Sequence, residues 1–469
     1  METNDYEEGS VPSDQRRSWL PIALIWVAIG SDISGAFLGI ELASGMSFEQ
    51  AIAATLVGSL ILGLLAMVFA YVGAATGLTT AMISRAVFGR VGGTILALAL
   101  TVSMLGWFAV QIGFFGVNAQ SAFTEVTGVN IPVFVFTIVG GAVMVLTAVW
   151  GYRAIARVTT VTVPLLLLLL TLGVIVAVST RGFTDAAATS ETVFTFGGSI
   201  SLVMGIYMLG IVTAPDMARW AKSPGKAMAA GFVGFFFGNS IIVVVAIVLS
   251  EIMSDTDLVG MFFTLGLGGA AVIILLLAPW VVNTTNIYST SLDFAAVTRR
   301  FSRRTYTLVG GLVGILIGTA GFYEAFVPFI SAMGIVISPF GGVYLAAFIH
   351  DRQRLEAAAD PTRSNTNMNA IIAWTFGIVI GALTTHPEAG LGFGSFDLTT
   401  IPSLDAMTVA FGVYLILTRT LPHTRPATSR QSSSGLDSAG QTPTRQNSTG
   451  AECHSSNKSD NKLSEEGKA

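Results

Sequence analysis

The most constraining feature of this sequence is a succession of apolar stretches, each close to the length that crosses a lipid bilayer. A helix of about 20 residues spans the roughly 30 Å hydrocarbon core of a membrane. Twelve such stretches occur, at residues 19–43, 49–76, 92–123, 131–150, 157–180, 195–217, 227–250, 260–289, 306–324, 326–349, 369–386 and 404–420. The third and eighth are long, which favours tilted spans or ends that do not cross the membrane. The sequence therefore predicts an all-α polytopic membrane protein with twelve transmembrane helices.

The composition excludes several other classes of protein. Only 11% of the residues are charged, whereas a soluble chain carries about 25%. The net charge of −4 gives no general affinity for nucleic acid. The single cysteine, Cys453, excludes disulfides and cysteine-based metal sites within one chain. Because acidic residues precede the first apolar stretch, the sequence lacks the basic-then-apolar order of a cleaved signal, and we expect a retained helix.

The basic residues predict how the chain is oriented. If the N-terminus is inside, 23 of the 24 Lys and Arg residues fall in cytoplasmic segments, and only Arg181 falls outside. The outer loops are acidic instead, with residues such as Glu125, Asp185 and Asp255. This asymmetry follows the positive-inside rule. We therefore expect a multi-pass protein of the plasma membrane, with both termini in the cytoplasm.

The chain divides into three regions on the same grounds. Residues 1–18 form a short cytoplasmic segment, and residues 19–420 form the membrane domain. Residues 421–469 are rich in Ser, Thr, Asn and Gln and contain no aromatic residue, Val or Ile. Such a segment cannot bury enough apolar surface to offset its ordering entropy. A disordered cytoplasmic tail is predicted there.

No catalytic motif is present in the sequence. There is no glycine-rich loop ending in Gly-Lys-Ser/Thr, no His-Glu-x-x-His zinc motif, and no histidine well inside a predicted span. We therefore expect neither an enzyme nor a bound cofactor. Binding and conformational change are the activities that fit, which favours a secondary transporter. A non-transporting membrane receptor is a less favoured alternative, and only the long tail supports it. The sequence gives no indication of oligomeric state.

Glycines interrupt two of the predicted spans at equal spacing. Gly30 and Gly35 flank Asp32 in the first span, and Gly205 and Gly210 occupy the sixth. Interrupted spans at corresponding places in two halves of a chain indicate the central binding site of a transporter. These two spans would open repeats of five helices, at about 19–180 and 195–349. Alternatively, the glycines allow close packing between helices.

Polar residues inside the spans are candidates for the site. A carboxylate such as Asp32 costs at least about 2.5 kcal/mol in a membrane by insertion scales, and is normally paired or functional. Trp107 and Gln111 are four residues apart and share one helix face. An aromatic plane beside an amide suits a flat heterocycle that forms hydrogen bonds, although Trp107 could equally pack within the bundle.

The eighth span contains an unusually polar stretch. Asn283, Thr284 and Thr285 lie within an otherwise apolar segment. Their oxygens suit a small cation or the edge of a substrate. The alternative is that they form hydrogen bonds between helices.

Seven short segments together resemble the nucleobase–cation symporter-1 family, and within it the bacterial cytosine permeases. They are GAATGLTT, SRAVFG, GWF, APDMARW, GFFFGNS, NIYSTSLDFA and ISPFGGV. The resemblance extends from about Leu20 to Arg419. It implies a leucine-transporter-type 5+5 inverted repeat with broken helices 1 and 6, and peripheral helices at 369–386 and 404–420. It also implies uptake of a nucleobase, cytosine or a purine-like heterocycle, by cation symport and alternating access.

The resemblance implies roles for individual residues. Trp107 matches the tryptophan that stacks on the base, and Tyr207 stands where cytosine permeases have a phenylalanine over the other face. Gly210 matches a small residue whose backbone lies beside the base. Gly30 matches a carbonyl donor to sodium, and Ile33 lies near the second donor.

Four positions depart from the family pattern. Met104 replaces a glutamine three residues before the tryptophan, and Val281 and Val282 replace two hydroxyl residues of the sodium site. Thr284 and Thr285 would serve only after a shift of about one helical turn. Asp32 is an addition.

These departures leave the coupling ion open between H⁺ and Na⁺. They also leave open whether the substrate is a nucleobase, hydroxymethylpyrimidine, allantoin, a hydantoin or an amine-bearing compound. In each case, we expect the substrate edges to meet Gln111, Asn283 and the backbone near Ser31 and Gly210, with Asp32 in proton coupling or substrate selection.

Overall fold

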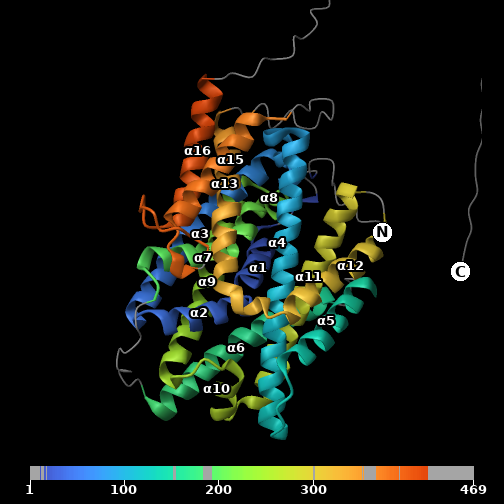
Figure 1. The fold of residues 1–469 in the computed structure, drawn as a ribbon, viewed down its shortest axis with the longest axis vertical. Helices are drawn as coiled ribbons and strands as arrows, with labels where there is room; N and C mark the ends of the chain where they lie inside the picture. Colours follow the sequence, from blue (N-terminus) through green and yellow to red (C-terminus); the bar gives the residue numbers. More distant parts are fainter. Residues whose placement is uncertain are drawn as a thin grey trace, which may run out of the picture. The chain divides into compact units, whose positions relative to one another are not determined.

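The computed structural model describes residues 18–150, 155–182, 193–298, 301–350, 366–389 and 391–420, with Val11, Gln15, Arg16 and Arg352. Every regular element in these ranges is a helix (Figure 1). Among the residues that the structure describes, six helices are long and apolar enough to cross a membrane, and the pair α1/α2, bent by 48°, is a seventh candidate. The all-α membrane class is thus confirmed, whereas the count of twelve spans stays a prediction. The tail predicted at 421–469 lies outside the described residues.

The helices follow the order of the predicted apolar stretches. They are α1 (Trp19–Gly30), α2 (Ile33–Gly45), α3 (Phe48–Thr76), α4 (Thr80–Thr127), α5 (Val133–Trp150), α6 (Ile155–Arg181), α7 (Phe196–Val212), α8 (Ala214–Ala218), α9 (Pro224–Met253), α10 (Leu258–Thr264), α11 (Gly268–Thr298), α12 (Arg303–Thr319), α13 (Phe326–His350), α15 (Met368–Thr384) and α16 (Pro402–Thr420). Two short 3-10 turns, η2 (Phe322–Ala325) and η4 (Pro387–Ala389), also lie in the described residues.

Two predicted stretches differ from the helices in their limits. Helix α4 starts at Thr80 and not near residue 92, and it is kinked at Gly89, where φ is 75°. Its first turns carry Arg85 and Arg90, so hydropathy does not mark them as part of a span. The eighth stretch is divided into α10 and α11 at Gly266, which also has a positive φ of 73°. Glycine adopts this left-handed conformation without steric cost.

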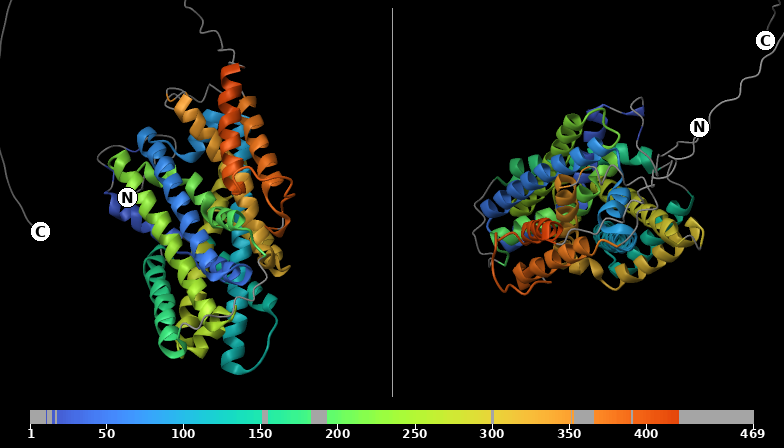
Figure 2. Two further views of the ribbon diagram at one scale, coloured as in Figure 1. Left: turned by 90° about the vertical axis from the view of Figure 1, so that its left-hand side faces the viewer. Right: turned by 90° about the horizontal axis from the view of Figure 1, so that it is seen from above.

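Glycines bring the broken first helix directly against α9. A Cβ atom at Gly30 would lie 3.0 Å from the carbonyl oxygen of Gly234, and one at Gly39 would lie 2.6 Å from that of Val243. Small residues permit such close backbone approach between membrane helices. On the other side of α9, α3 runs beside it (Figure 2). Close packing and interruption of the helix, weighed as alternatives from the sequence, therefore coexist in this region.

This packing predicts a clear effect of enlarging Gly39. The Gly39→Val substitution should lower the free energy of unfolding by about 1–3 kcal/mol, because the added atoms have no space. The thermal midpoint of purified protein in detergent measures the loss. Gly412→Val is the matched control, because a Cβ atom at Gly412 meets nothing within 4 Å. Equal midpoints for the two variants would contradict the packing argument.

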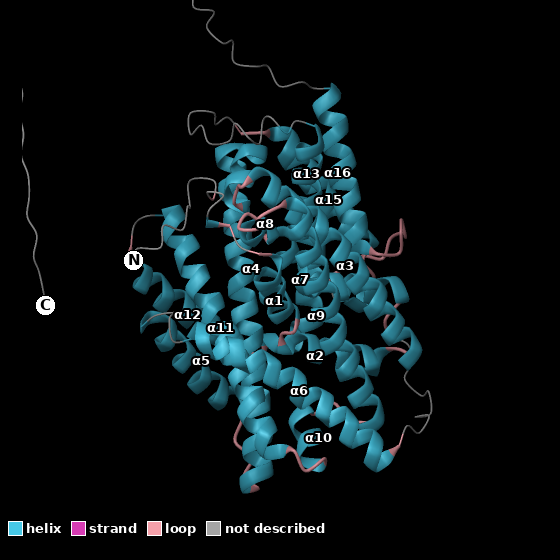
Figure 3. Ribbon diagram, turned by 180° about the vertical axis from the view of Figure 1, so that it is seen from behind, coloured by secondary structure: helices cyan, strands magenta, loops and turns pink. Residues whose placement is uncertain are grey.

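The hairpin of α15 and α16 is attached to α13 and α7. All three helices α13, α15 and α16 lie side by side (Figure 3). Ser403, near the start of α16, and Ser201 of α7 share a hydrogen bond of 2.6 Å between their hydroxyl oxygens. The hairpin is therefore fixed to the same helix that carries Tyr207.

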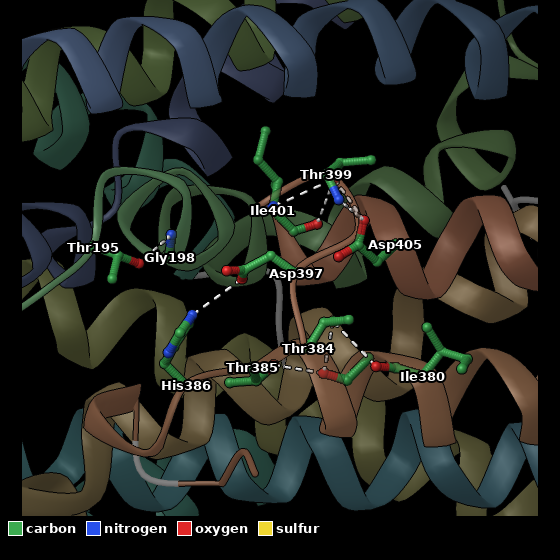
Figure 4. Close-up of polar contacts among 11 residues, drawn as sticks. Thr195, Gly198, Ile380, Thr384, Thr385, His386, Asp397, Thr399, Ile401 and Asp405 are labelled. Atoms are coloured by element: carbon green, nitrogen blue, oxygen red, sulfur yellow. Dashed lines mark hydrogen bonds and ion pairs between the residues drawn. The ribbon is translucent and has the colours of Figure 1, made fainter. Parts of the chain in front are cut away.

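Polar contacts order the connection between α15 and α16 (Figure 4). The buried Asp405 carboxylate accepts hydrogen bonds from the Thr399 backbone N (3.0 Å) and the Thr399 hydroxyl (2.6 Å). His386 Nε2 lies 3.1 Å from Asp397 Oδ1, but the two side chains are 36% and 52% exposed, so this pair contributes little to stability. Backbone hydrogen bonds from Phe393, Gly394 and Ser395 to the end of α15 act together with the buried Asp405.

Candidate functional site

The first helix is broken at Ser31 and Asp32, inside the bundle. Helix α1 ends at Gly30, and α2 begins at Ile33 with Asp32 as its N-cap. The Ser31 hydroxyl donates to the Gly238 carbonyl oxygen (3.2 Å), and Asp32 Oδ2 accepts from the Ser34 backbone N (3.4 Å). Side chains of this kind satisfy the backbone groups that a helix end leaves unpaired. The break predicted from the sequence is therefore present, with its carboxylate at the start of α2.

Asp32 pairs with Gln111 across two elements. Gln111 Nε2 on α4 donates to Asp32 Oδ2 (3.0 Å), and the Ser34 hydroxyl donates to the same oxygen (2.7 Å). The carboxylate is 8% exposed and the amide 2% exposed. Both donors bond to the same carboxylate oxygen, Oδ2. The other oxygen of each side chain, Asp32 Oδ1 and Gln111 Oε1, is buried and has no partner among the described residues.

Tyr207 of α7 reaches the same turn. Its hydroxyl lies 3.4 Å from the position that a Cβ atom of Gly35 would occupy, which is ordinary van der Waals contact. The hydroxyl is buried and has no hydrogen-bond partner in the described part of the chain. The ring packs edge-on against Phe235 of α9, with centroids 6.3 Å apart, and Gly210 faces the same phenylalanine.

Trp107 lies one helical turn before Gln111, within a cluster of aromatic rings. It packs edge-on against Phe329 of α13, with ring centroids 5.1 Å apart. Phe37 of α2 stacks on Phe114 of α4 at 3.9 Å, and Phe114 meets Phe326 edge-on at 5.0 Å. We call Phe37, Phe114, Phe326 and Phe329 the aromatic cluster.

Sequence reasoning missed the aromatic cluster, although one signal was available. Phe114 follows Trp107 by seven residues, so the two side chains lie on one face of α4. The sequence offers no comparable signal for the α13 rings, because their positions depend on how distant helices pack.

The sixth predicted span, which consists of α7 and α8, is interrupted at Thr213 and not at its glycines. Helix α7 runs without a break through Gly205 and Gly210 to Val212, and α8 begins at Ala214. Pro215 explains why the interruption lies at Thr213, because proline has no N–H to donate and restricts the backbone conformation of the residue before it. Asp216 Oδ1 then accepts from the Thr80 backbone N (2.7 Å), so α8 caps the start of α4.

Two of the residues expected to bind a coupling ion, Asp32 and Ile33, line a small cavity. Ser31, Asp32 and Ile33 line it together with Thr162 of α6 and Val282 of α11. From α11 the lining consists of Ala278 and Val282, neither of which has a side-chain oxygen.

The polar residues of α11 point elsewhere. The Thr284 hydroxyl donates to the Trp280 carbonyl of its own helix (2.7 Å), and the Thr285 side chain lies outside the described residues. Asn283 Nδ2 donates to the Phe108 carbonyl oxygen (3.0 Å) and lies 3.5 Å from the Met144 sulfur. The structure thus brings Ser31, Asp32, Gln111 and Tyr207 together, whereas Asn283 lies between α4 and α5.

Comparisons with known proteins agree on the kind of molecule. A family described as permease for cytosine/purines, uracil, thiamine, allantoin matches residues 10–407. The cytosine permease of Escherichia coli (strain K12) is 28% identical over 380 residues, which cover 81% of this chain and 89% of the relative.

Solved structures share the fold. Mhp1 in an inward-facing conformation gives a TM-score of 0.76 at 16% identity, covering 89% of this chain and 94% of that one. Mhp1 in a closed conformation with bromovinylhydantoin bound, a nucleobase-cation-symport-1 family transporter, gives 0.69 at 16% identity, with 90% and 98% covered. A sodium-coupled sialic acid symporter gives 0.60 at 12% identity, with 90% and 92% covered.

Proposed function

Because the chain belongs to the family of permeases for cytosine/purines, uracil, thiamine and allantoin, we propose that it imports a nucleobase-like heterocycle by cation symport and alternating access. Membership confirms the resemblance seen in the sequence and makes the chain a multi-pass membrane permease. The observation that carries the proposal is the broken first helix, where buried oxygens of Asp32, Gln111 and Tyr207 have no hydrogen-bond partner among the described residues and come from the start of α2, from α4 and from α7. A ligand bound there shifts the access equilibrium by its differential affinity for the two states.

The base stacks on Trp107, and Tyr207 covers its other face. Its polar edge meets Gln111, Asp32 and the backbone at Ser31, while Gly210 leaves room beside the ring. The burial of these residues and the polar groups at the break support this placement. Asn283 is left out of the substrate contacts, because its amide nitrogen is engaged by Phe108.

We also propose the wider arrangement expected from the sequence. Helices α1–α6 and α7–α13 correspond to the two repeats, α15 and α16 are peripheral, and both termini lie in the cytoplasm. The order of the helices and the asymmetry of the basic residues support it.

Saturable uptake by purified protein in liposomes tests the proposed function. Radiolabelled cytosine should accumulate. Unlabelled purines, hydroxymethylpyrimidine, allantoin and a hydantoin should inhibit this uptake in the order of their affinity for the site. A receptor that does not transport would bind a base without moving it into the vesicle. Binding of a base, seen as a raised thermal midpoint, without uptake would therefore overturn the proposal of transport.

Coupling by protons is favoured over coupling by sodium. The α11 lining of the small cavity lacks side-chain oxygens, while Asp32 supplies a carboxylate that can carry a proton. Uptake at fixed pH should therefore persist when choline replaces sodium, and a protonophore should collapse it. Uptake that requires sodium would instead favour Gly30 and Ile33 carbonyls with Thr284 and Thr285 as ion ligands.

A further inference from the structure

Three buried oxygens at the break of the first helix lack a hydrogen-bond partner among the described residues. They are Asp32 Oδ1, Gln111 Oε1 and the Tyr207 hydroxyl. Their side chains are 8%, 2% and 6% exposed, so bulk water does not satisfy them. Buried polar atoms in folded proteins are nearly always paired. Three such atoms, from α4, α7 and the start of α2, lie at one break in a helix, which makes this break the candidate place for a ligand that supplies the missing partners.

The hydrogen bonds already present determine that two of these atoms act as acceptors. An ionised carboxylate can only accept, so the Gln111 amide presents its nitrogen to Asp32 Oδ2, at 3.0 Å. The carbonyl oxygen of the Gln111 amide, Oε1, then faces away from that bond. Ser34 also donates to Oδ2 (2.7 Å), which leaves Oδ1 as the free oxygen of the carboxylate. The break thus offers two neighbouring acceptors, one of them charged.

We propose that Asp32 Oδ1 and Gln111 Oε1 form a paired-acceptor subsite that selects heterocycles bearing an exocyclic amine. This inference rests on the proposed function and names its substrate class. Two acceptors require two donors, which the two N–H bonds of one exocyclic amino group provide. An oxo group in the same position would place a carbonyl oxygen against the carboxylate and leave both acceptors unpaired. The Tyr207 hydroxyl is free to donate to an acceptor elsewhere on the ring.

A bare cation would also satisfy these oxygens, because Na⁺ and similar hard ions take oxygen ligands. The amine is favoured because Trp107, on the same face of α4 as Gln111, suits a flat ring and offers no oxygen ligand to an ion. The two ligands differ in a measurable way. An ion would stabilise the protein without any base present, whereas an amine edge makes the affinity depend on the base.

Competition against uptake of radiolabelled cytosine tests the subsite through pairs of closely related bases. Cytosine and 2-hydroxypyrimidine differ only in the amino group, and adenine and hypoxanthine exchange an amine for an oxo group. In each pair, the base that lacks the amine should inhibit about 10- to 100-fold more weakly, because buried acceptors are left unpaired.

The Gln111→Met variant examines the amide directly. It keeps a similar volume but removes the acceptor, so the preference for the amine should shrink by about tenfold. Gln120→Met is the matched control on the same helix, because Gln120 bonds to Asn130 near the surface, and it should keep the full preference. If Gln111→Met does not fold, the comparison of bases on the unaltered protein still decides the question.

The outcomes separate the subsite from the proposed function. Equal inhibition by both members of each pair overturns the subsite and leaves nucleobase transport intact. Sodium alone raising the thermal midpoint, with no preference for the amine, overturns it in favour of an ion. Absence of uptake and binding for every base overturns the proposed function, and the subsite with it.

Discussion

Replacing Trp107 with alanine is expected to abolish saturable uptake of radiolabelled base, whereas Trp107→Phe should transport with a raised KM. Stacking between a base and an aromatic ring contributes about 1–3 kcal/mol, which corresponds to about 5- to 150-fold in affinity. Phenylalanine keeps an aromatic plane of smaller area. Initial uptake rates over a range of base concentrations give KM and the maximal rate for each variant.

Packing offers a second reason for such a loss, and Phe329→Ala controls for it. Trp107 packs edge-on against Phe329, so truncating either ring removes buried contacts at a cost of about 3–5 kcal/mol. If stacking on the base is the role of Trp107, Phe329→Ala should melt earlier but transport with a near-normal KM. Identical kinetic losses in the two alanine variants would contradict the stacking role. Normal uptake by well-folded Trp107→Ala protein would refute it outright.

The second large effect is expected from Asp32→Asn. The variant should lose accumulation driven by an imposed pH gradient. It should keep exchange of labelled for unlabelled base across the membrane at saturating concentrations of base, which offset the weaker binding expected from altering a substrate contact. Asparagine preserves the size of the side chain, but it cannot take up and release a proton. A pH jump applied to loaded vesicles measures accumulation, and counterflow with excess internal base measures exchange.

Asp216→Asn is the matched control for the loss of a buried carboxylate. Asp216 Oδ1 accepts from the Thr80 backbone N, a contact that an asparagine oxygen can also make. This variant should therefore stay coupled to the pH gradient. Wild-type accumulation by Asp32→Asn, or an equal loss in both variants, would show that Asp32 is not the coupling group.

The helices were predictable because apolar stretches of membrane length are a strong and local signal. Their ends were less predictable, as the start of α4 at Thr80 illustrates. The first turns of α4 carry Arg85 and Arg90, and their stabilising partner, Asp216, is 136 residues away from Thr80 in the chain. No local pattern predicts such a contact.

The candidate site was predictable in its members but not in its contacts. Asp32 and Gln111 stand out because polar groups are costly in a membrane, yet their hydrogen bond joins residues 79 apart. Asn283 stands out for the same reason, but the rotation of α11 about its axis directs it to Phe108. Polar residues on several faces of one helix leave that rotation undetermined by the sequence.

The glycine contacts of the first helix have a mechanical consequence. Gly30, just before the break, sits on the backbone of α9 at Gly234, and Gly39, after the break, sits on it at Val243. Any change in the 48° angle between α1 and α2 would lift one of these glycines off α9 and open a void. Because both α1 and α2 are packed against α9, a displacement of one of these helices should move the other two with it. We therefore expect α1, α2 and α9 to move as one rigid body.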